Sequence, residues 1–453
     1  MTRRQPLAVW LYGIHIATLS ERQYNKFRLD FNPEARADVL QGSTILSISM
    51  PFTPGRRPNA TIVRGWFDAI LPEGNARTVV ANLFGVQPGD DYALIENIGK
   101  DCAGAVIIQP MKESATQEEG MVVPLRAGEL EQMVAELPQR PFGAGPQMRV
   151  SLAGMQEKLL LAETPDGQLG KPINGAPSTL ILKPEDVRLP GYAKGEAFAL
   201  GMAKHLGLTN VTAEIVTVEE RDVLKVSRYD RVKTSTGVKR IHQEDATQAL
   251  GLNLAGAPER KYQAHGGPSF REFATILRIA GQSSALDKLL ALTVLNVVIG
   301  NADAHARNLS ILHHRDGSVD LAPAYDLTPT TFYRNIPTRD GPRNMSDELG
   351  MFINGKRSIH DVRRSDLQKE GESWGLTHSG AENVIERTIS EIGRYLNHPP
   401  LNNIPPKMLE FFIARLRTLD DKEGPGGNGI KGPEMHIIMP QSKLINRDLP
   451  GLW

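Results

Sequence analysis

Hydrophobic and polar positions alternate at the start of the chain, and this pattern predicts β-strands. Apolar residues dominate 7–11 and 14–19, on either side of the pair Tyr12-Gly13, which suits a tight hairpin turn. Residues 27–31 alternate between apolar and charged positions, so a third strand is expected there. The chain is therefore expected to begin with a small sheet.

Helical spacing also occurs within this β-rich segment. Residues 63–71 and 75–83 carry apolar side chains three and four positions apart, so each predicts a helix. Residues 47–50 predict the end of a further strand, and the apolar residues 105–108 close the unit. No residue of this unit carries obvious catalytic chemistry.

A second set of strands follows a connector. Residues 111–147 mix charge, Pro and Gly around one helical stretch at 125–137, which is typical of a connector. Strands are then predicted at 159–161, 179–184, 212–218 and 223–227. Between them, residues 195–207 form an amphipathic pattern that ends at Gly207, a common helix stop.

Helical spacing dominates from about residue 243 onward. The predicted helices are 244–251, 270–280, 284–299, 370–374, 380–395 and 407–419. The Gly- and Pro-rich tail after residue 420 is expected to lie loosely on the surface. The pattern as a whole predicts a strand-rich first half and a helical second half.

Composition narrows the class of protein. The chain has 453 residues, 40% of them hydrophobic and 23% charged, as in an ordinary globular protein with room for two or three domains. The formal net charge is zero, so no global attraction to nucleic acid or membrane is expected. A single cysteine, Cys102, excludes an intramolecular disulfide framework and a cysteine-based zinc cluster.

Targeting signals are not expected. No apolar run reaches the roughly 18 residues that a membrane helix needs. The basic N-terminus precedes only a short apolar run, interrupted by Tyr12, Gly13 and His15, which predicts a strand rather than a signal peptide. We expect a cytoplasmic protein without a membrane partner.

The clearest candidate chemistry follows the apolar helix predicted at 284–299. Asp303 and Asn308 stand five positions apart in a polar loop, and Asp326 follows in a strand-like segment. This is the spacing of a kinase catalytic loop followed by a metal-binding aspartate. One carboxylate would meet the acceptor hydroxyl, while the amide oxygen and the second carboxylate would hold Mg²⁺ on the phosphates of ATP.

Two other interpretations of this loop stay open at this stage. Asp, Asn and His favour turns because they hydrogen-bond locally, so the loop could simply cap a buried helix. Asp303 and His305 could also bind a metal ion in a hydrolase. Other motifs along the chain are needed to distinguish between these interpretations.

Other segments of the chain carry residues that could bind a nucleotide. Residues 150–158 form a small-residue turn with one glycine, which could lie against phosphates or could be an ordinary hairpin turn. Lys183 ends a strand, where kinases place a lysine on the α- and β-phosphates. Glu196 could pair with Lys183 or could only favour the helix dipole. The strands that end near Ser227 lead through a short connector into helical sequence, the layout of a two-lobed kinase.

A modest basic cluster lies at a different place in the sequence from these motifs. It consists of Lys356, Arg357, Arg363 and Arg364. Such a cluster is either a solvated face or a contact for a phosphate backbone.

With these motifs in this order along the chain, the sequence resembles the HipA family of bacterial toxin serine/threonine kinases. The resemblance covers about residues 7–419. Its strongest parts are residues 299–308 and 323–326, and the segments 151–158, 182–184, 227–231, 243–245 and 266–268 fall where the family has its own versions. The catalytic loop alone also looks like that of phosphoinositide-kinase-like enzymes.

The resemblance implies a fold and a division of the chain. The fold would be α+β and bilobal, like a protein kinase, with a mixed β-rich N-terminal lobe and a helical C-terminal lobe. The implied segments are a β-rich subdomain at 1–112, a connector at 113–147, a kinase-like N-lobe core at 148–230, a helical C-lobe at 231–420 and a tail at 421–453.

The resemblance also assigns roles residue by residue. Asp303 would be the catalytic base, Asn308 and Asp326 the Mg²⁺ ligands, and Lys183 the phosphate-binding lysine. The implied ATP-binding residues are Ala153, Gly154, Met155, Gln156, Glu157, Lys158, Lys183, Ser227, Arg228, Tyr229, His305, Ala306, Arg307, Asn308, Tyr325 and Asp326. Spacing alone supports only Asp303, Asn308 and Asp326.

Regulation and partners are likewise implied by the resemblance. Ser151 would be autophosphorylated and so would silence the enzyme, because a phosphoserine repels the triphosphate. A small helix-turn-helix antitoxin, similar to HipB, would hold the kinase inactive on operator DNA, and the basic cluster could touch DNA in that complex. Family substrates include aminoacyl-tRNA synthetases, notably glutamyl-tRNA synthetase, whose phosphorylation arrests growth.

The functional expectation is therefore Mg²⁺-dependent transfer of a phosphoryl group from ATP to a protein hydroxyl. Two alternatives remain: a small-molecule or lipid phosphotransferase that shares the catalytic loop, and a catalytically silent corepressor that acts with its antitoxin. The intact set of Lys183, Asp303, Asn308 and Asp326 argues against the silent protein.

Overall fold

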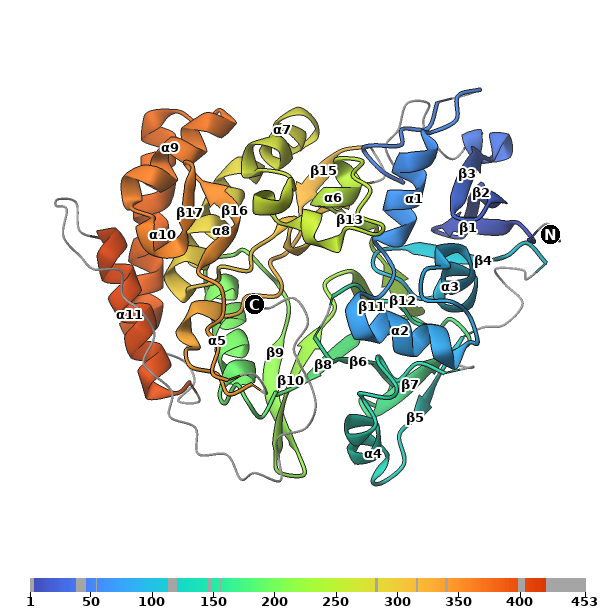
Figure 1. Cartoon of the computed structure of the whole chain (residues 1–453), viewed down its shortest axis with the longest axis horizontal. Coiled ribbons are helices and arrows are strands. Elements are labelled where there is room, and N and C mark those ends of the chain that lie inside the picture. Colours follow the sequence, from blue (N-terminus) through green and yellow to red (C-terminus); the bar gives the residue numbers. More distant parts are fainter. Residues whose placement is uncertain are drawn as a thin grey trace.

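A computed structural model describes most of the chain and gives it an α+β architecture (Figure 1). The described residues are 4–37, 46–53, 55–112, 120–145, 148–154, 156–281, 284–314, 317–338, 341–397 and 404–420. Met155 and the predicted tail therefore lie outside them. Strands and short helices fill the N-terminal part, and helices gather at the opposite end of the molecule, so the expected two-part α+β fold is confirmed.

The N-terminal unit is built on a four-stranded sheet with the order β3-β2-β1-β4. Its strands are β1 (Leu7–Leu11), β2 (Ile14–Gln23), β3 (Lys26–Phe31) and β4 (Val106–Pro110). Tyr12 and Gly13 both have positive φ, 53° and 80°, which is the geometry of a tight hairpin turn. The predicted hairpin and third strand are confirmed.

Three helices complete this unit. They are α1 (Ala60–Asp68), α2 (Gly74–Leu83) and α3 (Asp91–Ile98), of which the sequence pattern predicted the first two. The strand expected to end at residues 47–50 is wrong. The Ser47 and Ser49 side chains bond to each other, and the Ser49 hydroxyl donates to the Gln248 carbonyl, so this segment is a turn bound to the C-terminal part.

The second sheet has six strands in the order β5-β7-β6-β8-β10-β9. They are β5 (Met121–Pro124), β6 (Leu159–Glu163), β7 (Leu169–Ile173), β8 (Leu180–Pro184), β9 (Ala213–Val218) and β10 (Arg221–Ser227). The segment predicted to be a connector thus supplies an edge strand, β5, as well as helix α4 (Glu129–Ala135). Helix α5 (Tyr192–His205) lies beside β9 and β10.

Two small β-structures lead into the helical part. The hairpin of β11 (Arg231–Thr234) and β12 (Gly237–Arg240) precedes a sheet of β13 (Gln243–Asp245), β14 (Ser310–His313) and β15 (Val319–Leu321). The helix predicted from residue 244 is therefore wrong at its start. Helix α6 (Ala246–Ala249) begins only after Asp245, which caps it together with Gln248.

The helical part agrees with the predicted spacing more closely. Its long helices are α7 (Phe270–Ala280), α8 (Ala285–Ile299), α9 (Arg364–Trp374), α10 (His378–Asn397) and α11 (Pro406–Asp420). A hairpin of β16 (Glu348–Ile353) and β17 (Lys356–Ser358) packs near them. Short 3₁₀ helices are η1 (Pro33–Ala37), η2 (Pro258–Lys261), η3 (Gln263–His265), η4 (Ala306–Asn308), η5 (Thr330–Phe332) and η6 (Ile359–Asp361).

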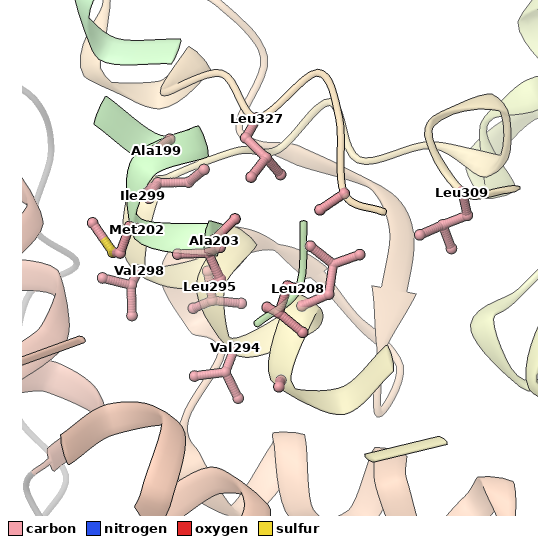
Figure 2. Close-up of a cluster of buried hydrophobic side chains, with 14 of the residues drawn as sticks. Ala199, Met202, Ala203, Leu208, Val294, Leu295, Val298, Ile299, Leu309 and Leu327 are labelled. Atoms are coloured by element: carbon pink, nitrogen blue, oxygen red, sulfur yellow. The ribbon is translucent and has the colours of Figure 1, made fainter. Parts of the chain in front are cut away.

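Helix α8 is the centre of the largest core. It is apolar on nearly every side and almost wholly buried, because α5, α10 and α11 surround it. Figure 2 shows its side chains gathered with those of α5 and of the loops around them, among which Ala199, Met202, Ala203, Leu208, Val294, Leu295, Val298, Ile299, Leu309 and Leu327 are labelled. The helix ends at Gly300, whose φ is 72°, and the candidate catalytic loop begins there.

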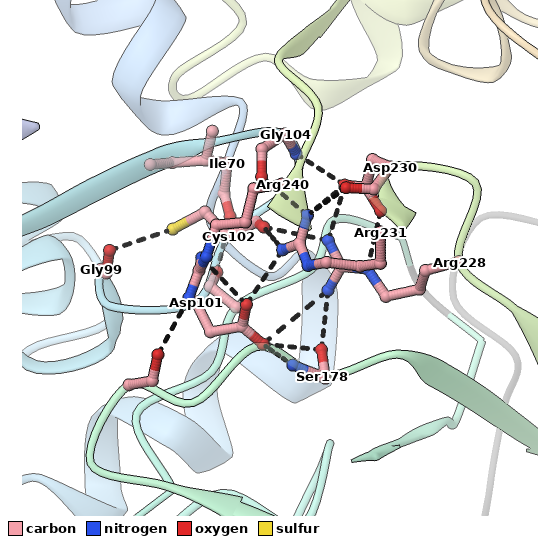
Figure 3. A network of polar contacts seen from close by, with 12 residues as sticks. Ile70, Gly99, Asp101, Cys102, Gly104, Ser178, Arg228, Asp230, Arg231 and Arg240 are labelled. Carbon is pink, nitrogen blue, oxygen red and sulfur yellow. Dashed lines mark hydrogen bonds and ion pairs between the residues drawn. The ribbon is translucent and has the colours of Figure 1, made fainter. Parts of the chain in front are cut away.

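A buried ionic network joins the N-terminal unit to the segment after β10 (Figure 3). Asp101 is fully buried and accepts hydrogen bonds from Arg231 at 2.9 Å and from the Ser178 hydroxyl at 2.6 Å. Arg228 contacts Asp230 at 2.8 Å, and Asp230 in turn accepts from the Gly104 amide at 2.7 Å. Every ionic group of this network has a partner, so the two parts are held in one orientation.

Replacing Asp101 with alanine is expected to lower the free energy of unfolding by about 3–5 kcal/mol, because it leaves the buried arginines without their carboxylate. Denaturant unfolding followed by circular dichroism measures this change. The control is Arg394→Ala, which removes an exposed ion pair with Glu391 and should cost less than about 1 kcal/mol. Equal stability of the Asp101 variant and wild type would contradict the assigned role of the network.

Candidate functional site

One cavity of about 1090 Å³ lies between the six-stranded sheet, the loop after α8 and the turn that joins α1 to α2. It collects most of the residues that the sequence singled out. Those that line it are Ala153, Gly154, Gln156, Glu157, Lys158, Lys183, Ser227, Arg228, Tyr229, Asp303, His305, Arg307, Asn308, Tyr325 and Asp326. Ala306 is buried and does not line the cavity, and Met155 lies outside the described residues.

The loop after α8 is shaped by its own hydrogen bonds. The side-chain nitrogen of Asn308 donates to the Asp303 carbonyl at 3.0 Å, and the His305 amide donates to the same carbonyl at 2.7 Å. A Cβ at Gly300 would lie 2.5 Å from the Thr331 hydroxyl, so only glycine fits where the loop leaves the helix. Asp303 and Asn308 are therefore presented on a short, internally bonded turn.

Asp303 faces the cavity and accepts a hydrogen bond from the Tyr262 hydroxyl at 2.8 Å. Burial raises the pKa of its carboxyl group to about 6, while Lys261 and the Tyr262 hydrogen bond act in the opposite direction. A carboxylate with such a pKa can accept a proton near neutral pH. The sequence reading did not include Tyr262, because it lies on a separate segment about forty positions before Asp303.

Lys183 and Glu196, both buried, form an ionic triad with the partly exposed Asp326. The Lys183 ammonium lies 2.7 Å from a carboxylate oxygen of each acid. Burial alone would lower the pKa of Lys183, but the two carboxylates hold that pKa well above its usual value. Of the two roles left open for Glu196, the structure shows the ion pair with Lys183. Asp326 has a left-handed backbone, with φ of 55°, and keeps part of its carboxylate exposed to the cavity.

Lys158 organises the loop before β6. Its ammonium donates to the Ala153 carbonyl at 3.0 Å and would lie only 2.7 Å from a Cβ at Gly154, whose φ is 108°. Burial and the neighbouring Lys183 lower the pKa of Lys158 to about 8. The loop therefore needs glycine at this point and brings a cation to the cavity.

The opposite end of the cavity is aromatic and apolar. The rings of Tyr229 and Tyr325 stack with centroids 5.6 Å apart, and Ile181, Leu200 and Val211 line the same space. The Arg228 guanidinium bonds instead with Asp230, Ser178 and the Cys102 carbonyl in the network of Figure 3. The Arg228 guanidinium is thus used within that network, whereas the tyrosines offer flat surfaces for a planar ring.

The N-terminal unit also enters the cavity, which the sequence did not indicate. Glu73, in the turn between α1 and α2, lies 2.7 Å from Arg307 and 2.9 Å from Lys261. Burial alone would raise the pKa of Glu73, but these two cations lower it to about 2, so the carboxylate stays charged. No local pattern distinguishes such a glutamate, since its partners lie about 190 and 230 positions away in the chain.

Ser151 is fully buried beside the cavity. Its hydroxyl donates to the Ile70 carbonyl at 2.5 Å, and its amide donates to the Asp101 carbonyl at 2.9 Å. The residue therefore connects the loop before β6 with the N-terminal unit. A phosphate on this oxygen has no room while that contact persists.

The basic cluster lies elsewhere, and much of its charge is already paired. Arg364 contacts Glu382 at 2.6 Å and also Glu386, and Arg357 contacts Glu348 at 2.7 Å. Arg363 donates to the His360 carbonyl at 2.8 Å, and Lys356 is exposed. The four side chains do not form one unbroken positive surface.

Two absences concern only the residues that the structure describes. Among them, no helix is long and apolar enough to cross a membrane. Nor do three or more His, Cys, Asp or Glu side chains gather there as a metal-binding group of their own. A Mg²⁺ ion held by one carboxylate, one amide oxygen and nucleotide phosphates needs no such group.

Comparisons with known proteins find relatives over most of the chain. A family model for the HipA N-terminal domain matches residues 7–109, and one for the HipA-like C-terminal domain matches residues 150–395. A putative kinase of Sinorhizobium fredii, Y4mE, is 35% identical over 341 residues, which cover 74% of this chain and 79% of that protein. The serine/threonine-protein kinase toxin HipA of Shewanella oneidensis is 30% identical over 369 residues, 78% of each chain.

A solved structure gives the same picture of the fold. HipA of Shewanella oneidensis, in a complex with HipB and its operator DNA, superposes with a TM-score of 0.70 at 23% sequence identity. The match covers 91% of this chain and 95% of that one.

Proposed function

The chain belongs to the HipA family, and we propose that it is a protein kinase that transfers the γ-phosphoryl group of ATP to a serine or threonine hydroxyl. The observation that carries the proposal is the meeting of Asp303, Asn308 and Asp326 with the Lys183–Glu196 pair in one cavity. Phosphoryl transfer depends on positioning and charge neutralisation, and these residues supply both.

The residues divide the chemistry between them. Asp303 would take the proton of the acceptor hydroxyl. As it does so, the hydroxyl oxygen bonds to the γ-phosphorus, and the bond from that phosphorus to the β–γ bridging oxygen breaks, which releases ADP. Lys183 would hold the α- and β-phosphates, and residues 153–158 would cover the triphosphate. The stacked Tyr229 and Tyr325 fit the adenine end. ATP-binding roles for Ser227 and His305 belong to the same proposal.

Asn308 and Asp326 suit a Mg²⁺ ion. The nitrogen of the Asn308 amide is used in the bond to Asp303, so its oxygen is the atom that a cation would meet. Asp326 adds a carboxylate that stays charged, because burial is outweighed by Lys183 and Lys158, which hold its pKa well below the usual value. The ion would neutralise phosphate charge.

Label distribution from γ-labelled ATP tests the class of acceptor. The protein is incubated with labelled Mg-ATP and a bacterial lysate that keeps its metabolites, beside the same lysate without the protein, and acid-precipitated protein is separated from soluble metabolites. We expect label on serine or threonine of protein, and glutamyl-tRNA synthetase is the first purified acceptor to add. Label confined to metabolites or lipids would contradict a protein kinase. The absence of any transfer would favour a silent corepressor.

We also propose a helix-turn-helix antitoxin as the partner, since the Shewanella complex contains HipB and operator DNA. An operator-bound complex would leave Lys356 and Arg357 as the members of the basic cluster most able to reach DNA. Because Arg364 already contacts two glutamates, it would contribute least.

Phosphorylation of Ser151 is expected to weaken ATP binding at least about tenfold. Phosphate cannot occupy the contact with the Ile70 carbonyl, and its two negative charges would repel the triphosphate, so the loop should leave its place. Calorimetric titration of phosphorylated protein with Mg-ATP, before and after phosphatase treatment, measures this effect. Ser151→Ala, treated alike, is the control. Unchanged affinity after quantitative phosphorylation would exclude the switch.

A further inference from the structure

The loop after α8 lacks an available cation of its own. Its one arginine, Arg307, directs the guanidinium away, to Glu73 at 2.7 Å, to Asp245 at 3.3 Å and to the Ala69 carbonyl. A transferring phosphoryl group needs positive charge at its oxygens, and beside a Mg²⁺ ion this charge would come from cationic side chains of other segments.

Lys261 lies in the same cavity as Asp303. It ends η2, lines the cavity together with Asp303, and has a side chain only 6% exposed. The next residue, Tyr262, bonds directly to Asp303 at 2.8 Å. Of the charges that act on the Asp303 carboxyl group, that of Lys261 has the largest effect. Lys183, in contrast, is held between Glu196 and Asp326.

Glu73 fixes the position of this ammonium group. One carboxylate oxygen contacts Lys261 at 2.9 Å and the other contacts Arg307 at 2.7 Å, so a single side chain of the N-terminal unit orients both cations. Glu73 also stands at the start of α2, and its carboxylate is buried. The N-terminal unit is thus part of the wall of the cavity beside Asp303.

We propose that Lys261 is a further catalytic residue, which meets the γ-phosphate of ATP, and that Glu73 is the positioning residue that holds it there. This inference rests on the proposed kinase function. No bond forms to Lys261. Its ammonium group offsets the negative charge on the γ-phosphoryl oxygens while the bond to the bridging oxygen breaks.

A purely structural role for the Lys261–Glu73 ion pair, as a link between the two parts of the molecule, predicts different behaviour. Loss of a structural link would weaken the binding of every nucleotide alike, or would lower only the stability of the fold. Loss of a γ-phosphate contact lowers the transfer rate and the affinity for ATP and leaves the affinity for ADP unchanged, because ADP lacks that phosphate.

The test compares Lys261→Met and Lys261→Arg with wild type in the full-length protein. Calorimetry measures binding of Mg-ADP and of a non-hydrolysable ATP analogue, and label transfer from ATP measures the rate. We expect Lys261→Met to slow transfer about 10²–10³-fold, the usual effect of losing one donor to the developing charge. Its ADP affinity should stay within about twofold of wild type. Lys261→Arg should recover most of the rate.

Matched variants separate catalysis from folding. Ser49→Ala removes a hydrogen bond to the Gln248 carbonyl across the same interface. Ser49 itself does not line the cavity, so this variant should leave rate and affinities unchanged. In Lys261→Met, Glu73 keeps its contact with Arg307 at 2.7 Å. The double variant Glu73→Gln with Lys261→Met removes both charges of the lysine–glutamate pair, and it reports the same readouts if the single variant unfolds.

The proposal would be overturned if Lys261→Met transferred phosphate at the wild-type rate, or if it lost ADP and ATP-analogue affinity to the same extent. Both outcomes leave the kinase function standing, because wild type still transfers phosphate. A wild-type protein that transfers no phosphate would overturn the kinase function and this inference with it.

Discussion

Replacing Asp303 with asparagine is expected to slow phosphoryl transfer about 10²–10⁴-fold while the fold and nucleotide binding stay intact. Asparagine has the same shape and still accepts a hydrogen bond from Tyr262, which lies 2.8 Å from the Asp303 carboxylate. It cannot accept the proton of the acceptor hydroxyl. Initial rates of label transfer, measured beside calorimetric ATP affinity and the midpoint of thermal unfolding, test this separation.

The matching control is Asp320→Asn, since Asp320 is a carboxylate on β15 that does not line the cavity. That variant should keep the wild-type rate. If Asp303→Asn unfolded, or if it transferred phosphate at full rate, Asp303 would be a structural residue of the loop and not the base.

The same residue predicts the pH dependence of the wild-type enzyme. Burial raises the pKa of Asp303 to about 6, above the ordinary value, so the carboxyl group is protonated below that pH. Only the carboxylate can accept a proton, and transfer should therefore fall about tenfold per pH unit below pH 6 and level off above it. A rate that stays flat from pH 5 to 8 would contradict this assignment.

Asp326→Ala is expected to abolish the Mg²⁺ dependence of ATP binding and to slow transfer on the order of 10³-fold, because the metal loses its carboxylate ligand. Lys183 keeps its ion pair with Glu196 at 2.7 Å, so the buried lysine retains a partner and the fold should persist. ATP affinity is measured with and without Mg²⁺ in both proteins.

In wild type, Mg²⁺ should strengthen ATP binding, and in Asp326→Ala it should have little effect. Asp320→Ala serves as the control, because it removes a carboxylate of the same type outside the cavity. A Mg²⁺ effect of equal size in Asp326→Ala and wild type would mean that the ion, if bound, is held elsewhere.

Local pattern predicted those parts of the molecule that depend on local contacts. Helix α7 and most of α8 follow their hydrophobic spacing, since each presents apolar residues to one core. Asp303 and Asn308 lie within one short loop, so their spacing in the sequence is enough to predict that they lie close together. The edge strand β5 was missed because its four residues show no pattern of buried positions and are held by pairing with β7, far along the chain.

The rest of the cavity arises from contacts between distant segments. Glu73, Lys261 and Tyr262 come to Asp303 from two other parts of the chain, and nothing beside them in the sequence marks them as polar partners. For Glu196 the sequence left two alternatives, and only the 2.7 Å contact with Lys183 decides between them. The short segment 47–50 was misassigned because its hydrogen bonds go to another unit.

The most direct measurement incubates unphosphorylated wild-type protein and Asp303→Asn with γ-labelled Mg-ATP and follows transferred label by mass spectrometry of the peptides. The account predicts transfer to a serine or threonine by wild type, with Ser151 among the labelled positions, and transfer about 10²–10⁴-fold slower by Asp303→Asn. A folded wild-type protein that binds no ATP and transfers no label would contradict it.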